Sequence, residues 1–252
     1  DPEDPVHAIA LALAVVIIGT QFAFGLFVDE LGSFQATPAL TIADLLGQQL
    51  PLLVVAAIGV GLYIRRGTRE TVSRLGWVRP AWWHIVLGLA AAGVFLAVSV
   101  AMGALSDALT PELSRRIQST TDHLFGGLVG NPLSVLAIAL LPGICEETIF
   151  RGALQPRLGL ILTAILFASI HTQYSISIDT LTVLILGLGL GLIRKYTNTT
   201  TSAITHATYN LITGIGIGGL ALGIAGVVEV GLIVVSAYAI WSNRRPAPTA
   251  GP

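Results

Sequence analysis

Three groups of polar side chains lie inside otherwise apolar runs of this sequence. They are Glu146-Glu147 with Arg151, His171, and His206 with Asn210. Burying a charged side chain at the centre of a bilayer costs roughly 2.5–3.5 kcal/mol on insertion scales, and attachment to lipid does not require such groups. A carboxylate can act as a general base, and imidazole or amide N–H groups can stabilise an oxyanion. The pattern therefore predicts a buried chemical site.

Helical spacing separates the roles of the two adjacent glutamates. Glu147 and Arg151 are four residues apart, so they can form an ion pair on one helix face. Glu146 points about 100° away around the helix and has no local partner. One turn earlier, Pro142 cannot donate to the carbonyl of Ile138, which predicts a kink. We interpret the Glu147–Arg151 pair as structural and Glu146 as the candidate reactive acid.

The other two groups have the same four-residue spacing. Phe167 and His171 share one helix face, and His206 and Asn210 share another. Each pair alone is also typical of structural hydrogen bonds between helices. Their interpretation therefore depends on whether they meet the glutamates.

The composition indicates a membrane protein. The 252 residues are 54% hydrophobic and 11% charged, whereas a soluble domain has about 25% charged residues, and the mean hydropathy is +0.81. The net charge of −1 gives no electrostatic reason to expect nucleic acid binding. The single cysteine, Cys145, excludes an internal disulfide.

The apolar runs predict an all-α polytopic bundle of about eight transmembrane spans, since each span needs about 20 apolar residues. The predicted spans are 7–28, 47–64, 82–104, 132–156, 159–175, 177–194, 199–217 and 219–241. The segment 105–130 is polar enough for an external loop with a short amphipathic helix. We expect one domain over 1–245, with the motifs within 130–215, and a disordered tail over 246–252.

The distribution of basic residues orients this bundle. With eight spans, nearly all loop arginines and the only lysine fall on one side, which the positive-inside rule makes cytoplasmic. Only Arg115 and Arg116 fall on the other side. Both termini are then cytoplasmic, in a multi-pass protein of the cell membrane.

Glu146, His171 and His206 are predicted to lie at one depth. Each is eleven or twelve residues from a predicted cytoplasmic turn, which is roughly 16–18 Å along its helix at 1.5 Å per residue. Three separately placed polar groups thus reach a common level. The site is expected to open towards the cytoplasm.

The three motifs together resemble those of the CAAX protease and bacteriocin-processing family, intramembrane glutamic proteases related to the type II CAAX prenyl endopeptidase. The family pattern is EExxxR, then FxxxH, then an HxxxN-like pair. Here these motifs are Glu146-Glu147 with Arg151, Phe167 with His171, and His206 with Asn210. The resemblance covers about residues 130–215.

The resemblance implies an endopeptidase that hydrolyses a peptide bond of a membrane-associated or prenylated, CAAX-type substrate. Its catalytic residues would be Glu146, His171, His206 and Asn210. Its supporting residues would be Glu147, Arg151 and Phe167. In this scheme Glu146 activates a water that His171 orients. His206 and Asn210 then form the oxyanion hole.

The implied partners are a peptide or protein substrate and the lipid bilayer, with no nucleic acid, no cofactor and no metal. Two alternatives remain open. Glu146, His171 and His206 could instead bind zinc in a metalloprotease. The second alternative is a non-catalytic scaffold or transporter. It is suggested by Glu229, an isolated acid within a predicted span. A cysteine protease built on Cys145 is disfavoured, because no histidine partner is evident.

Overall fold

The computed structural model describes the chain except residues 1–4, 217–219 and 244–252. The described residues are helical, and their only β pairing is an isolated bridge between Leu62 and Arg66. The predicted tail over 246–252 lies outside the described residues. The all-α class is therefore confirmed.

The long helices correspond in order to the predicted apolar runs. They are α1 (Pro5–Phe27), α3 (Ile42–Gly59), α5 (Trp82–Leu109), α7 (Pro132–Glu147), α8 (Gln155–Ser169), α9 (Ile178–Tyr196), α10 (Thr199–Ile215) and α11 (Leu220–Asn243). Shorter elements connect them: α2 (Glu30–Gln35), α4 (Thr68–Arg74), α6 (Pro111–Phe125), the π-helical turn η1 (Thr148–Leu154) and the 3-10 turn η2 (Thr172–Tyr174). The amphipathic helix expected within 105–130 is α6.

Within the part of the chain that the structure describes, fewer helical stretches qualify as membrane spans than the eight that the sequence predicts. Among the described residues, five helical stretches are long and apolar enough to span a membrane: Ala8–Phe27, Ile42–Gly59, Trp82–Leu109, Pro132–Ser169 and Gly223–Asn243. The fourth stretch is broken at Gly159, where φ is +78°, a conformation that glycine adopts without strain. The chain is an integral membrane protein, and the count of eight spans stays a prediction.

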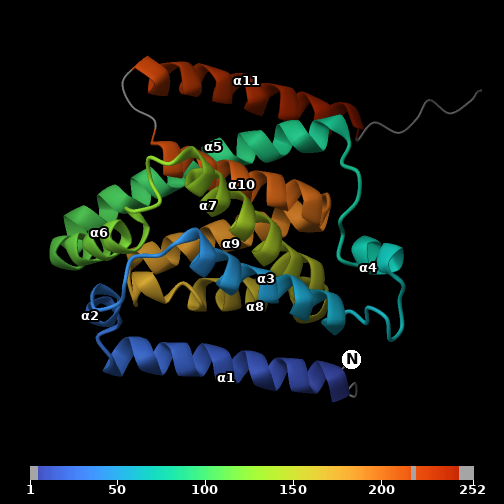
Figure 1. The fold of residues 1–252 in the computed structure, drawn as a ribbon. Coiled ribbons are helices and arrows are strands. Elements are labelled where there is room, and N and C mark those ends of the chain that lie inside the picture. Colours follow the sequence, from blue (N-terminus) through green and yellow to red (C-terminus); the bar gives the residue numbers. More distant parts are fainter. Residues whose placement is uncertain (1–4, 217–219, 244–252) are drawn as a thin grey trace, which may run out of the picture.

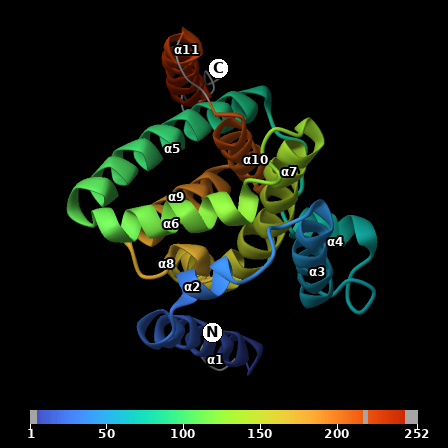
Figure 2. The same cartoon turned by 60° about the vertical axis from the view of Figure 1, so that its left-hand side comes forward.

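Helices α7 and α10 form the centre of the bundle. They lie side by side, α5 packs against α10, and α8 and α9 form a second close pair (Figures 1 and 2). Helix α1 covers α8 on one side of the molecule, and α11 covers α5 on the opposite side (Figure 1). The central helices therefore carry the motif residues, while α1 and α11 expose large apolar faces.

Gly143 allows the closest approach within this centre. A Cβ at Gly143 would lie 2.9 Å from the backbone nitrogen of Ala207, closer than packed atoms tolerate. Helix α10 thus lies directly against the segment of α7 that precedes the glutamates. The glycine therefore sets the distance between the first and the third motif.

Two boundaries differ from the prediction in ways that affect the site. Helix α3 begins at Ile42 rather than 47, because Thr41 and Asp44 form a reciprocal capping box that continues the helix through polar residues. Helix α8 ends at Ser169 rather than at 175. The first change adds a capped polar turn before Gln49, which already lay in the predicted span, and the second places His171 beyond a helix end.

Candidate functional site

The Glu147 carboxylate is the most highly connected group of the site. Its side chain is fully buried at the end of α7. Its Oε1 lies 3.2 Å from Nη1 of Arg151 and 3.0 Å from Nδ1 of His206. Its Oε2 accepts a hydrogen bond of 2.5 Å from the hydroxyl of Ser202. A buried carboxylate is stable only with such partners. The expected Glu147–Arg151 pair is thus confirmed, and His206 joins it.

Arg151 extends this cluster towards α8 and α9. Its guanidinium is 1% exposed and lies 4.3 Å from the centre of the Phe167 ring. Its Nη2 donates to the carbonyl of Gly187 at 3.0 Å. Because Arg151 lies in the π-helical turn η1, one side chain connects that turn to two further helices. π-Helical turns are frequent at functional sites.

Glu146 lies on a different face of α7 from Glu147. It is 6% exposed, and its Oε1 accepts a hydrogen bond of 2.9 Å from Nε2 of Gln49 on α3. Its Oε2 is buried, and no hydrogen-bond partner for it occurs in the described part of the chain. The prediction of an unpaired acid is therefore wrong for one oxygen and right for the other. Gln49 escaped the sequence analysis because it is remote in sequence and matches no motif.

His171 caps the end of α8 through its side chain. Its Nδ1 lies 2.7 Å from the carbonyl oxygen of Phe167, which would otherwise accept the backbone N–H of His171. A carbonyl can only accept, so Nδ1 carries the proton and Nε2 of the neutral ring has a free lone pair. His171 thus presents Nε2 as a proton acceptor.

His206 is oriented in a similar way from α10. Its Nδ1 faces the Glu147 carboxylate, which can only accept, so this nitrogen also carries a proton. Its ring is 7% exposed and lies edge-on to Phe167, with centroids 5.9 Å apart. The Phe167 ring also contacts the His171 ring at 4.7 Å. One aromatic side chain therefore separates the two imidazoles and fixes their spacing.

Asn210 compensates for the proline in α7. Pro142 has no N–H for the carbonyl of Ile138, and Nδ2 of Asn210 lies 3.5 Å from that oxygen. This is a long hydrogen bond, and the second amide proton of Nδ2 is not used by it. Asn210 therefore holds α7 to α10 and keeps a donor for another acceptor.

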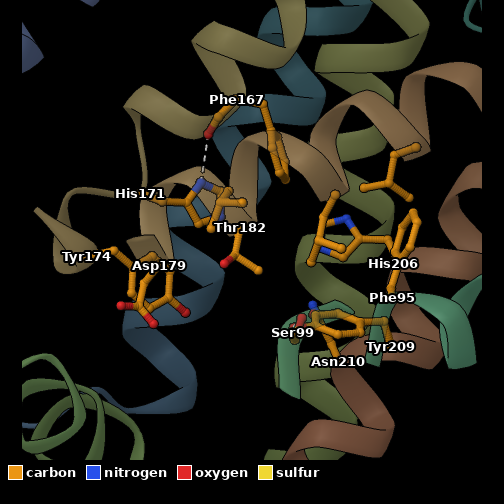
Figure 3. Close-up of a pocket in the computed structure, with 13 residues that line it drawn as sticks. Phe95, Ser99, Phe167, His171, Tyr174, Asp179, Thr182, His206, Tyr209 and Asn210 are labelled. Atoms are coloured by element: carbon orange, nitrogen blue, oxygen red, sulfur yellow. Dashed lines mark hydrogen bonds between the residues drawn. The ribbon is translucent and has the colours of Figure 1, made fainter. Parts of the chain in front are cut away.

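A cavity of about 180 Å³ connects these residues. Its wall contains His171, His206 and Asn210 together with Phe167, and its other polar lining residues are Ser99, Tyr174, Asp179, Thr182 and Tyr209. Figure 3 shows His171, Tyr174 and Asp179 on one side of this space and His206, Tyr209 and Asn210 on the other. Glu146 is not part of the wall. Three of the four predicted catalytic residues thus share one cavity, and the fourth, Glu146, lies outside its wall.

A second cavity of about 240 Å³ adjoins the first. It lies between α1, α8 and the start of α9. The surface that lines it is mainly apolar, although Gln21, Glu30 and several serine and threonine residues also contribute to its wall. His171 contributes to both cavities. A Cβ at Gly25 would lie 2.9 Å from the side chain of Ile176, so this glycine allows α1 to approach. An apolar space therefore continues from the polar one at the position of His171.

The residues that motivated the zinc, cysteine-protease and transporter alternatives do not form a second site. Across the described residues, no three His, Cys, Asp or Glu side chains converge as metal ligands would. His171 and His206 each direct Nδ1 to a carbonyl or carboxylate oxygen, as zinc-bound imidazoles often do. Glu146 does not complete a ligand set with these two imidazoles. Cys145 is a buried free thiol outside both cavities. Glu229 lies far along the chain on α11, packed against α5 at Gly93.

Comparison with known protein families identifies a match to the central helices. Residues 128–212 match the family model described as "Type II CAAX prenyl endopeptidase Rce1-like". This segment is about a third of the chain and contains α7, η1, α8, α9 and most of α10. No curated protein and no solved structure matches the chain.

Proposed function

We propose that the chain is a member of the CAAX protease family, whose model matches residues 128–212, and that it is an intramembrane endopeptidase. Its substrate is a membrane-associated or prenylated, CAAX-type peptide or protein, hydrolysed by a glutamate-activated water. The observations that carry the proposal are the cavity shared by His171, His206 and Asn210 and, on α7, the buried Oε2 of Glu146, which has no partner among the described residues. A protease in general follows from the family. The substrate and the mechanism are our inference.

In the proposed mechanism, the nucleophilic water lies between Glu146 and His171. It donates one hydrogen bond to Oε2 of Glu146, the buried oxygen that otherwise has no partner. It donates the other to Nε2 of His171, whose Nδ1 is occupied by the Phe167 carbonyl. Glu146 takes the proton as the water oxygen attacks the substrate carbonyl. The same carboxylic acid then returns that proton to the leaving amine.

The oxyanion forms on the opposite side of the cavity, at His206 and Asn210. Because Nδ1 of His206 already donates to Glu147, its Nε2 can donate only when the ring is an imidazolium. Before attack, Glu146 and Glu147 balance the charges of Arg151 and the imidazolium. Once Glu146 has taken the proton, the oxyanion replaces its negative charge, so the net charge stays zero. A neutral cluster avoids the cost of an uncompensated buried charge. Asn210 supplies the second donor through its unused amide proton.

The apolar second cavity supports a lipid-modified substrate. It adjoins the polar cavity at His171 and is lined by side chains such as Ile18, Phe22, Ile165 and Leu184. A hydrocarbon chain buried there would leave water at about 0.8 kcal/mol per CH₂ group. We propose that it holds the prenyl or acyl chain while the peptide bond lies between the imidazoles. No cofactor or metal takes part in the proposed mechanism.

We further propose the orientation predicted from the arginines, with both termini and the cavity opening on the cytoplasmic side of the cell membrane. Cysteine variants at exposed Arg69 and at Arg115 in α6 would report it. With Cys145 replaced by alanine, a membrane-impermeant thiol reagent on intact cells is expected to label position 115 and not position 69. The opposite labelling would reverse the orientation.

The activity itself is tested by mass spectrometry of membrane peptides. Cells that express the wild-type chain are compared with cells that express Glu146→Gln. New peptide termini are expected only with the wild-type chain. Identical peptides in both samples would reject proteolysis through Glu146 and would favour a non-catalytic scaffold or transporter.

A further inference from the structure

Apart from its histidines, the ionisable side chains that line the polar cavity are of acidic type. Asp179 is its only carboxylate, and neither lysine nor arginine occurs among its lining residues. The ion pairs found between described residues do not include Asp179. Within the described part of the chain, the hydroxyl of Ser106 donates a hydrogen bond of 3.0 Å to its Oδ2. The cavity therefore contains a carboxylate without a cation.

Asp179 is held in this position from two helices. It lies in the first turn of α9, where the Ser177 side chain accepts from its backbone N–H and caps the helix. Ser106 of α5, which binds its carboxylate, is 0% exposed. An acid at a helix start stabilises the helix by a few tenths of a kcal/mol to about 1 kcal/mol, and a solvent-facing side chain would suffice for that. The buried hydroxyl and the cavity wall point to a ligand instead.

The location of Asp179 relates it to the proposed reaction. It lies beside Tyr174, near the His171 side of the cavity and across from His206 and Asn210 (Figure 3). A peptide bond that reaches the two imidazoles would therefore place a neighbouring substrate residue next to this carboxylate. A substrate carboxylate there would meet a like charge, whereas a basic side chain would meet its counter-ion.

We propose that Asp179 determines substrate specificity by binding a lysine or arginine side chain of the substrate within a few residues of the scissile bond. This inference rests on the proposed function and names a feature of its substrate. It also implies that a free C-terminal carboxylate of the substrate lies outside this end of the cavity. A unit charge pair in a partly hydrated site corresponds to about a tenfold preference of lysine over glutamate.

The test uses the full chain in detergent and a synthetic library of farnesylated cysteine peptides. Each of the three positions on either side of the cysteine is lysine, glutamine or glutamate in turn. Values of kcat/KM are measured for the wild type, for Asp179→Asn and for Asp179→Lys. Asp179→Asn keeps the size and the bond to Ser106, so it covers the case in which Asp179→Lys does not fold. Binding of the same peptides to Glu146→Gln is measured in parallel.

The matched control is Asp107→Asn. Asp107 lies next to Ser106 and accepts from the Ser114 hydroxyl at 2.5 Å, but it does not line the cavity. The Asp107→Asn substitution removes the same charge as Asp179→Asn, from the same end of the molecule. Its lysine-to-glutamate preference is expected to equal that of the wild type.

The proposal predicts that lysine is favoured about tenfold over glutamate at one position, that Asp179→Asn reduces this ratio to within about twofold, and that Asp179→Lys inverts it. Equal rates for lysine and glutamate peptides in the wild type would overturn it, as would an unchanged preference in Asp179→Asn. If nothing is cleaved but Glu146→Gln binds the lysine peptides about tenfold more tightly, the charge selectivity stands and the proposed hydrolysis fails.

Discussion

The carboxylate of Glu147 lies 3.0 Å from Nδ1 of His206, although 59 residues separate them in sequence. The same carboxylate pairs with Arg151 and accepts from Ser202. Helix α7 thus fixes the orientation of an imidazole of α10, with Nδ1 donating to the carboxylate and Nε2 left for the cavity. The second glutamate of the motif therefore connects the structural ion pair to the proposed oxyanion site.

Replacing Glu147 by glutamine is expected to destabilise the chain. The change leaves the fully buried Arg151 guanidinium without an anion, which costs about 3–5 kcal/mol. The midpoint of thermal unfolding in detergent should fall clearly, and cleavage should be lost with it. An unchanged midpoint would contradict the structural role of this pair.

The double variant Glu147→Gln with Arg151→Met separates stability from activity. It removes both charges, so no unpaired ion remains, and buried pairs replaced in this way often keep or gain stability. The unfolding midpoint should recover towards the wild-type value. Cleavage should stay low because His206 has lost the carboxylate at Nδ1. Recovery of cleavage along with stability would show that Glu147 is only structural.

Gln49 is expected to position the catalytic acid. Its amide donates to Oε1 of Glu146 at 2.9 Å, which directs Oε2 away from α3. Gln49→Leu should reduce kcat about tenfold, the loss of one oriented hydrogen bond to a charged group, with little change in KM. Gln48→Leu is the control, because the neighbouring Gln48 side chain is exposed. Equal effects of the two changes would argue against this positioning role.

Gly143 sets the distance between α7 and α10. A Cβ there would lie within 3.0 Å of three atoms of Ala207, so Gly143→Ala must push the helices apart and move His206 and Asn210. We expect a loss of about 1–3 kcal/mol in stability and a larger loss of cleavage. Gly47→Ala in α3 is the matched control, since a Cβ there meets nothing within 4 Å. Alanine at that helical position should be neutral or stabilising.

The zinc alternative predicts a different response to chelators. No three candidate ligands converge among the described residues, so we expect cleavage to continue unchanged in 1,10-phenanthroline. The rate is measured with and without the chelator on the same peptide. A loss of activity that added zinc restores would return Glu146, His171 and His206 to the role of metal ligands.

Local spacing was enough to predict several parts of the site. The Glu147–Arg151 pair follows from four-residue spacing on one helix. Of the three residues predicted at equal depth, His171 and His206 share one cavity with Asn210, whereas Glu146 lies outside its wall. These features depend on helix geometry alone. The all-helical fold follows from the same apolar runs.

The remaining parts depend on contacts between distant segments. Gln49 and Ser202 have no motif, and their roles appear only when α3 and α10 are placed against α7. Asp179 resembles an ordinary acid at a helix start until Ser106 and the cavity are seen. His171 was expected within a helix, but its side chain takes over the carbonyl of Phe167 and the helix ends before it.

The most direct test of the mechanism is the cleavage rate of a farnesylated peptide by purified wild type and by Glu146→Gln. Glutamine keeps the size of the side chain and can still accept from Gln49, so the unfolding midpoint should not change. The rate should fall by at least about a hundredfold, as expected when a general base is removed. A wild-type rate in a correctly folded Glu146→Gln variant would contradict a glutamate-activated water.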